Sequence, residues 1–283
     1  MALNQLVGGS NPSQPVQMNR NEQFLLLKEC SDILKNEPNL LRLRKKNIVV
    51  VGDVHGSKRA VSLALEISES FDGVIFLGDY VDRGPYQIEA VNLVLSAKLE
   101  RPKSVFLLRG NHELPYMNEV YGFRHVVETM YDYEMWMNFN MCFSYLPYVG
   151  VLGDVMLVHG GISEGIKSIE DVDVYPKGMM VPPPEIEELL WNDPMDGISD
   201  FVFNEERMGF KKFGRGALID FLKRNSLSRL IRGHQPVKDG FYEMWDGKII
   251  TVFSSPETHP NKKGALLIFE SGEFHPVAIS SSI

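Results

Sequence analysis

The residues from Gly78 to Gly84 combine two carboxylates and a guanidinium in one turn. This stretch reads Gly-Asp-Tyr-Val-Asp-Arg-Gly and comes directly after the apolar run 74–77, so we expect a strand that ends in a charged turn. Three charged groups in such a place are costly to desolvate unless they meet ions of opposite charge. Asp79 is therefore expected to bind a metal ion and Arg83 a phosphate group. A single turn of this kind is more often solvated surface, so the interpretation depends on whether the pattern recurs.

The same pattern does recur at four other places in the chain. In each, an apolar run rich in β-branched residues is followed at once by side chains of the metal-binding kind. Four of the seven histidines stand at such positions, whereas a histidine used for packing would more often lie inside an apolar periodicity. The five runs therefore predict a single site built from their ends. Its further members are Asp53, His55, Asn111, His112, His159 and His234.

These side chains predict a pair of divalent metal ions. Imidazole, carboxylate and amide ligands without any thiolate suit borderline ions such as Mn²⁺, Fe or Zn²⁺. One carboxylate must bridge the pair, and Asp79 is the natural bridge because it follows the middle run. Ions about 3.5–4 Å apart would hold a shared hydroxide at neutral pH and clamp a phosphate ester for in-line attack. The ligands on one side of the bridge would be Asp53 and His55, and those on the other Asn111, His159 and His234.

Hydrolysis of a phosphate monoester also needs groups that hold the phosphate and protonate the leaving group. Arg83 and Arg207 can each offer two parallel N–H donors to phosphate oxygens, which lysine would not reproduce. The leaving alkoxide of serine or threonine is a strong base, so a general acid matters, and His112 is the candidate. Asp82 could accept a hydrogen bond from its other ring nitrogen and favour the imidazolium form.

The segments between the runs must bring these residues together. Apolar residues recur at helical spacing after the first and second runs, so strand, helix and strand follow one another and the strands should be parallel. Ligands of parallel sheets bind at the carboxyl ends of the strands, where the predicted residues would converge. The turn pairs Asp246-Gly247 and Ser271-Gly272 predict two C-terminal hairpins. Helices are expected over 22–36, 58–70, 87–98 and 119–143, and a short turn over 39–43.

Composition limits the class of protein. The chain has 283 residues and a net charge of −8, which argues against general nucleic-acid binding. No apolar run approaches the length of a membrane span, and its two cysteines form no disulfide framework, so we expect a reducing cytoplasm. Residues 1–22 lack hydrophobic periodicity and are expected to be a mobile tail. Because the ligands run from Asp53 to His234, residues 23–283 are expected to form a single catalytic domain.

The motifs together resemble the phosphoprotein phosphatase family, which includes protein phosphatases 1 and 2A and calcineurin. The resemblance covers roughly residues 25–279 and includes the landmarks Tyr121-Gly122-Phe123 and Phe213-Gly214. The aromatic side chains of 119–143, Tyr121 among them, are otherwise expected to pack in the core. The signature motifs are Gly-Asp-Val-His-Gly (52–56), Gly-Asp-Tyr-Val-Asp-Arg-Gly (78–84), Leu-Leu-Arg-Gly-Asn-His-Glu (107–113), His-Gly-Gly (159–161) and Arg-Gly-His-Gln (232–235).

This resemblance implies a fold, an activity and a role for each site residue. The fold would be the α/β calcineurin-like metallophosphoesterase fold, a central β-sandwich flanked by helices, which amends the open parallel sheet. The activity would be hydrolysis of phosphoserine and phosphothreonine in phosphorylated proteins, with Mn²⁺ expected in vitro. The first metal would be bound by Asp53, His55 and Asp79, and the second by Asp79, Asn111, His159 and His234. Phosphate would be bound by Arg83, Arg207 and Asn111, and protonation would depend on His112 and Asp82.

Two other functions stay open at this point, and one loop departs from the family. A hydrolase of dinucleoside polyphosphates would use the same metal ligands, and a scaffold that binds phosphoproteins without cleaving them is a more distant alternative. Eukaryotic members carry Ser-Ala-Pro-Asn-Tyr-Cys beside the active site, where this chain has Ser-Ser-Pro-Glu-Thr-His (254–259). That difference puts in doubt the contacts this loop makes with inhibitors. The short core resembles prokaryotic or archaeal members, and regulatory subunits stay unknown.

Overall fold

Short apolar runs form two mixed β-sheets that face each other in the computed structural model, which describes residues 18–207, 209–258 and 263–280. One sheet has the order β14 (Glu273–Ser280), β13 (Lys263–Glu270), β2 (Ile48–Val51), β3 (Val74–Phe76) and β4 (Val105–Leu107). The other has the order β1 (Leu40–Leu43), β5 (Val149–Leu152), β6 (Val155–Val158), β10 (Arg229–Arg232), β12 (Ile249–Val252) and β11 (Phe241–Met244). A third, small sheet has the order β7 (Asp193–Pro194), β9 (Lys211–Phe213) and β8 (Phe201–Phe203).

Parallel pairing brings the predicted ligand-bearing ends to one edge of the sandwich. Strands β2, β3 and β4 are parallel, with Val74 opposite both Val49 and Val105. In the facing sheet β6, β10 and β12 are parallel, and Val158 lies opposite Arg232. The two sheets thus each contribute strand ends to the site. The prediction of parallel strand-helix-strand units was right for the first sheet, and the sandwich explains why His159 and His234 come from the second.

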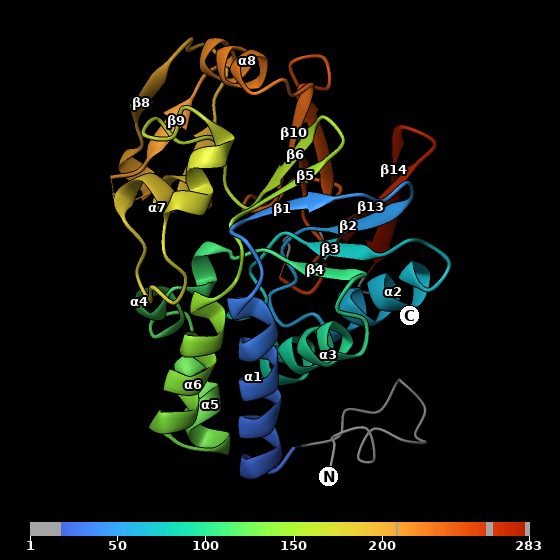
Figure 1. Cartoon of the computed structure of the whole chain (residues 1–283), viewed down its shortest axis with the longest axis vertical. Helices are drawn as coiled ribbons and strands as arrows, with labels where there is room; N and C mark the ends of the chain where they lie inside the picture. Colours follow the sequence, from blue (N-terminus) through green and yellow to red (C-terminus); the bar gives the residue numbers. More distant parts are fainter. Residues whose placement is uncertain (1–17, 208, 259–262, 281–283) are drawn as a thin grey trace.

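The core has three parts that define four layers (Figure 1). Between the sheets lie buried aliphatic side chains from both, such as Ile75 of β3 and Leu157 of β6. Five helices cover the outer face of the β2 sheet: α1 (Arg20–Lys35), α2 (Lys58–Ser68), α3 (Gln87–Glu100), α5 (Phe123–Met130) and α6 (Tyr133–Ser144). The other outer face packs against α7 (Pro184–Trp191) and α8 (Arg215–Arg224), together with the 3₁₀ segment η3 (Ile169–Val174). The short elements η2 (Asn111–Glu113), α4 (Pro115–Asn118) and η4 (Glu205–Arg207) complete the described chain.

This architecture confirms the predicted α/β class, a calcineurin-like central β-sandwich flanked by helices. Both predicted hairpins form, as β11-β12 and β13-β14. Their turns use positive φ at Asp246 (57°) and Ser271 (55°) and at the glycines that follow, which suits tight hairpin turns. Among the described residues, no helix is both long and apolar enough to cross a bilayer.

Three local predictions were wrong. Helix α1 starts at Arg20 because Asn19 caps it and Glu22 completes a capping box. The tail expected over 1–22 therefore extends too far toward the helix. Residues 1–17 of that tail lie outside the described part. The turn expected over 39–43 is strand β1, which pairs with β5. The helix expected over 119–143 is two helices, because Asp132 caps a new one and Gly122, at φ 119°, starts the first.

Candidate metal centre and active site

All six predicted metal ligands are buried and meet at one edge of the sandwich. Asp53 and His55 follow β2, Asp79 follows β3, and Asn111 lies in η2 after β4. The other two come from the facing sheet, where His159 follows β6 and His234 follows β10. Each has a relative exposure of 5% or less. The structure therefore brings the side chains predicted as ligands together, and they come from both sheets.

The ligand atoms fall into two groups that share Asp79. His55 Nε2 lies 3.6 Å from one oxygen of Asp79 and 3.8 Å from Asp53 Oδ2. On the other side, His159 Nε2 lies 3.3 Å from the second oxygen of Asp79. Asn111 Oδ1 lies 2.9 Å from both His159 Nε2 and His234 Nδ1. A carboxylate between two clusters of donors has the geometry of a bridging ligand.

Backbone contacts orient the imidazoles so that their lone pairs point into the site. His55 donates from Nδ1 to Val81 O at 2.8 Å, and His159 donates from Nδ1 to Leu77 O at 3.1 Å. In the neutral tautomer this leaves an unprotonated Nε2 on each ring, as metal ligation requires. The Nε2 of His159 then faces the amide oxygen of Asn111, so two acceptors lie close together, and a cation between them would remove the repulsion.

The electrostatics of the site also fit divalent cations. Burial, and then the neighbouring charge of Asp79, raise the pKa of Asp53 to about 6. Burial alone would raise the pKa of Asp79 too, but the imidazoles of His159 and His112 hold it well below its usual value. Burial and the proximity of His112 lower the pKa of His55 to about 3, which keeps this ring neutral. Asp53 Oδ2 has no hydrogen-bond partner among the described residues although it is buried. These residues fit two metal ions.

Asp82 and His112 form the predicted acid pair. His112 donates from Nδ1 to Asp82 Oδ2 at 2.6 Å, and its Nε2 lies 4.0 Å from Asp79. The other oxygen of Asp82 accepts from the backbone N–H of Phe123, the first residue of α5, at 2.9 Å. Burial lowers the pKa of His112, but Asp79 and Asp82 outweigh it and raise that pKa. The ring therefore favours the protonated form, with Nε2 facing the metal ligands.

The two arginines predicted to bind phosphate lie on different sides of the ligand clusters. Arg83 is exposed, and its charge lowers the pKa of both His55 and His112. Arg207 is half-buried, and after burial it is the largest cause of the lowered pKa of His234. Its Nε donates to Asp193 Oδ2 at 3.1 Å. The structure thus brings both guanidinium groups near the ligands, one next to each cluster.

Three residues near the site were given no role in it by the sequence analysis. Glu113 accepts from the backbone N–H groups of Asp79, Tyr80 and Gly110, each at 2.8 Å, and so fixes the turn that carries Asp79. Asp193 bonds both Arg207 and the buried Arg232, whose Nε donates to Gly160 O. Tyr121 is 46% exposed and contacts His112, so it does not pack in the core as expected. Glu113 ends a signature motif and Tyr121 belongs to a landmark of the resemblance, but neither motif by itself shows the contacts that these side chains make.

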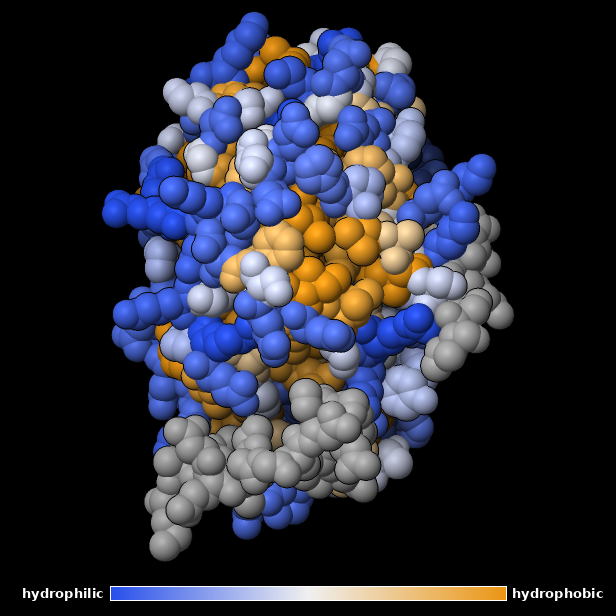
Figure 2. Space-filling model, turned by 90° about the vertical axis from the view of Figure 1, so that its right-hand side faces the viewer, coloured by the Kyte–Doolittle hydropathy of each residue, from blue (hydrophilic) through white to orange (hydrophobic). Residues whose placement is uncertain are grey.

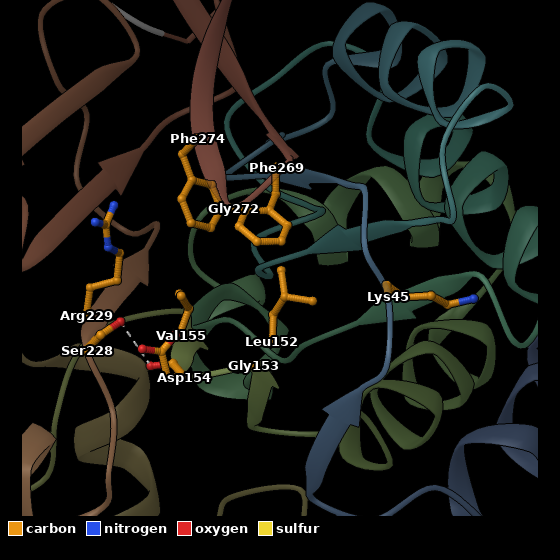
Figure 3. Close-up of a pocket in the computed structure, with 10 residues that line it drawn as sticks. All are labelled: Lys45, Leu152, Gly153, Asp154, Val155, Ser228, Arg229, Phe269, Gly272 and Phe274. Carbon is orange, nitrogen blue, oxygen red and sulfur yellow. Dashed lines mark hydrogen bonds between the residues drawn. The ribbon is translucent and has the colours of Figure 1, made fainter.

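A separate cavity of about 450 Å³ lies away from this centre (Figure 3). Its lining includes Leu152, Val155, Arg229, Phe269 and Phe274. Val155 and Arg229 are the first residues of β6 and β10, whereas the metal ligands follow the ends of those strands. Figure 2, which views the molecule from the right of Figure 1, shows an apolar area on that face bordered by polar side chains. The cavity therefore takes no part in the candidate centre.

Comparison with known proteins places this fold and centre in a family. The sequence model of the calcineurin-like phosphoesterase family matches residues 46–238, more than half of the chain. The chain therefore belongs to the calcineurin-like phosphoesterase family. Its class of activity is metal-dependent hydrolysis of phosphoesters.

Solved structures with the same fold include several phosphatases. The chain is similar to a protein serine/threonine phosphatase from Saccharomyces cerevisiae with similarity to human phosphatase PP5, at a TM-score of 0.82 and 24% identity over 94% of this chain and 91% of that one. It is similar to a cold-active protein-tyrosine phosphatase of a psychrophilic Shewanella species at a TM-score of 0.62 and 17% identity, over 89% and 84%. A candidate diadenosine tetraphosphatase gives a TM-score of 0.51 and 17% identity, over 87% and 100%. At these identities the similarity shows the fold.

Proposed function

We propose that this protein is a metal-dependent phosphatase that removes phosphate from phosphoserine and phosphothreonine in proteins. The observation that carries the proposal is the hydrogen-bonded pair of His112 and Asp82 beside Asp79, the carboxylate shared by both ligand clusters. An alkoxide leaving group is a strong base and needs a proton as the bond to phosphorus breaks. A histidine held protonated next to the phosphate site meets that need.

The ligand set supports binding of two divalent ions, for which we expect Mn²⁺ to serve in vitro and Fe or Zn²⁺ to be alternatives. Asp53, His55 and Asp79 would hold one ion, and Asp79, Asn111, His159 and His234 the other. Bound there, such ions would activate water as the nucleophile and neutralise charge on the phosphate.

The chain's own residues supply the rest of the reaction. Arg83 and Arg207 would bind the non-bridging phosphate oxygens from opposite sides, and Asn111 could donate from its amide nitrogen to the same group. As the bond from phosphorus to the leaving oxygen breaks, His112 would give its Nε2 proton to that oxygen. Asp82 would keep the ring in place through the Nδ1 hydrogen bond and stabilise its positive charge. The products are the free hydroxyl and inorganic phosphate.

A hydrolase of dinucleoside polyphosphates is the second candidate, supported by the fold shared with a candidate diadenosine tetraphosphatase. Its leaving group is a nucleotide phosphate, which is a far weaker base than an alkoxide and has less need of a general acid. The tight pair of His112 and Asp82 therefore favours the protein phosphatase. The yeast serine/threonine phosphatase, with the higher TM-score of 0.82, supports the same choice.

A direct competition between substrates tests this proposal. Metal-stripped protein is supplied with Mn²⁺ and then assayed on a phosphothreonine peptide and on diadenosine tetraphosphate at equal concentrations. The proposal predicts that the peptide is cleaved faster and only when Mn²⁺ is present. Faster cleavage of the dinucleotide would instead support the second candidate, and cleavage of neither would support a phosphoprotein-binding scaffold.

A further inference from the structure

Tyr121 presents its aromatic ring at the surface between the two groups that act on phosphate. It lies between α4 and α5 and is 46% exposed, although aromatic rings of this size are usually buried. One side of the ring meets the imidazole of His112 edge-on, with centroids 5.2 Å apart and an interplanar angle of 69°. The guanidinium carbon of Arg83 lies 5.0 Å from the ring centroid. A single ring thus touches both the expected proton donor and an expected phosphate ligand.

The backbone around Tyr121 is tied to the acid pair. The next residue but one, Phe123, donates its N–H to Asp82 Oδ1 at 2.9 Å. Tyr121 itself donates its N–H to Met117 O at 3.0 Å. Gly122 between them has φ 119°, a conformation that a residue with a side chain rarely adopts. The ring is therefore mounted on the same loop that holds Asp82.

Arg83 is exposed, and its guanidinium lies over the ring of Tyr121. It follows Asp82 in a turn where both residues have positive φ, 66° and 69°, so the turn projects the guanidinium outward. Within the described residues Arg83 forms no ion pair, and its long exposed side chain would otherwise be free to move. A guanidinium over an aromatic face gains attraction from the ring quadrupole, and the contact strengthens as water is excluded.

We propose that Tyr121 is a positioning residue that holds Arg83 over the phosphate site, a role that rests on the proposed phosphatase function. By fixing the guanidinium before substrate arrives, the ring lowers the conformational cost of binding phosphate. The contribution is expected in affinity for phosphate more than in the chemical step. Tyr121 would act through Arg83, and its hydroxyl is not required because the contact uses the ring face.

The test compares two substitutions of Tyr121 on the Mn²⁺-loaded protein. Affinity for inorganic phosphate is measured without turnover, as protection against thermal unfolding, and KM and kcat are measured with an aryl phosphate. Tyr121→Leu should weaken phosphate binding and raise KM by about 3- to 30-fold, with a smaller change in kcat. Tyr121→Phe should stay within about twofold of the wild type, because it keeps the ring.

Two controls separate positioning from a general structural effect. Tyr133, at the start of α6, carries Arg124 at 5.2 Å over its ring and packs on Trp136, so Tyr133→Leu removes the same kind of contact elsewhere and should leave phosphate affinity unchanged. In a double-mutant cycle with Arg83→Ala, Tyr121→Leu should add no further loss of phosphate affinity, because its effect passes through Arg83.

Each failure points to a different conclusion. Unchanged phosphate affinity in Tyr121→Leu, or additive losses in the cycle with Arg83→Ala, would overturn the role of Tyr121. An equal loss in Tyr121→Phe would also overturn it, since the hydroxyl would then be the active part. Because phosphate affinity needs no turnover, a protein that binds phosphate but leaves the phosphothreonine peptide intact contradicts the proposed function and not the role of Tyr121.

Discussion

The histidines of the candidate site differ in the acceptor that each Nδ1 meets. His55 and His159 each donate from Nδ1 to a backbone carbonyl, which leaves Nε2 facing the other candidate ligands. His112 donates from Nδ1 to the carboxylate of Asp82, which favours the imidazolium. A neutral carbonyl as acceptor suits the role of ligand proposed for His55 and His159, and a carboxylate suits the role of acid proposed for His112.

Replacing the expected acid tests this division at the residue scale. His112→Asn should lower kcat on a phosphothreonine peptide by about 10²–10⁴, because the leaving alkoxide loses its proton donor. The loss should be much smaller on p-nitrophenyl phosphate, whose leaving group is a weak base. Metal content, measured by atomic emission, should stay at the wild-type value. A fall in metal content, or an equal loss on both substrates, would show that His112 is not the acid.

At the scale of elements, the candidate site residues lie in the turns after the strands. Glu113 forms hydrogen bonds to two of these turns. Its carboxylate accepts N–H bonds from the turn after β3 and from Gly110 after β4. A Cβ on Gly110 would lie 2.2 Å from Asp79 Oδ1, so this close approach requires glycine. Contacts between loops that are distant in sequence therefore position the carboxylate of Asp79.

Glu113→Gln should weaken these contacts. The amide NH₂ would face backbone donors, leaving at least one buried N–H unsatisfied, at a cost of about 1–3 kcal/mol in unfolding free energy. Thermal and urea unfolding would measure the loss, and Mn²⁺ affinity should fall with it because Asp79 is displaced. The matched control is Glu119→Gln, an exposed carboxylate paired with Arg124, which should change the unfolding free energy by less than about 1 kcal/mol. Similar losses of unfolding free energy in both variants would argue against this role of Glu113.

The strands and the polar residues at their ends could be predicted from the sequence because they form a local pattern, a β-branched run followed by side chains of the metal-binding kind. The five runs from Val49 to Arg232 form strands as expected, and the ligands follow them. The break before α5 and the exposure of Tyr121 were missed, since helical periodicity continues across Gly122 and burial depends on distant neighbours. The partnership of Arg207 with Asp193 also depends on tertiary structure, because the two residues lie 14 positions apart in the sequence.

Lys177, which lies between η3 and α7, should make the free energy of unfolding depend on pH. Lys177 donates to Tyr145 O at 2.7 Å, and burial lowers its pKa from 10.5 to about 7, only partly offset by Glu37 and Asp173. Between pH 7 and 10.5 the unfolded chain therefore holds a proton on this lysine that the folded chain has lost. By linkage, this group makes unfolding free energy rise with pH across that range.

Lys177→Met should remove this slope. Urea unfolding at a series of pH values should show the variant more stable than the wild type near pH 7, with the difference shrinking as the pH approaches 10. Lys28→Met, at an exposed position of α1, controls for the loss of one positive charge and should show no such trend. A constant difference between Lys177→Met and the wild type at every pH would contradict a lowered pKa in the folded state.

At the scale of the whole molecule, the candidate centre joins the two sheets of the sandwich. Asp53, Asp79 and Asn111 come from the β2 sheet, whereas His159 and His234 come from the facing one. Acidic groups are buried close together at this edge: burial, and then the charge of Asp79, raise the pKa of Asp53. These buried charges cost free energy at the edge of the sandwich that forms the site. Metal ions bound there should offset that cost and stabilise the fold.

Metal removal should therefore lower the stability of the entire protein as well as its activity. A ligand at about one hundred times its Kd adds about 2.7 kcal/mol of stability to a single site, so saturating Mn²⁺ should raise the Tm of chelator-treated protein by several degrees. Hydrogen exchange should slow at the ends of both β3 and β6, since the ions would link them. Asp79→Asn removes the charge shared by both clusters and should abolish most of the rise in Tm, whereas His125→Gln, in α5, should keep it. An equal rise in wild type and Asp79→Asn would mean that Mn²⁺ binds elsewhere, and slowed exchange in only one sheet would mean that the centre does not hold the sandwich together.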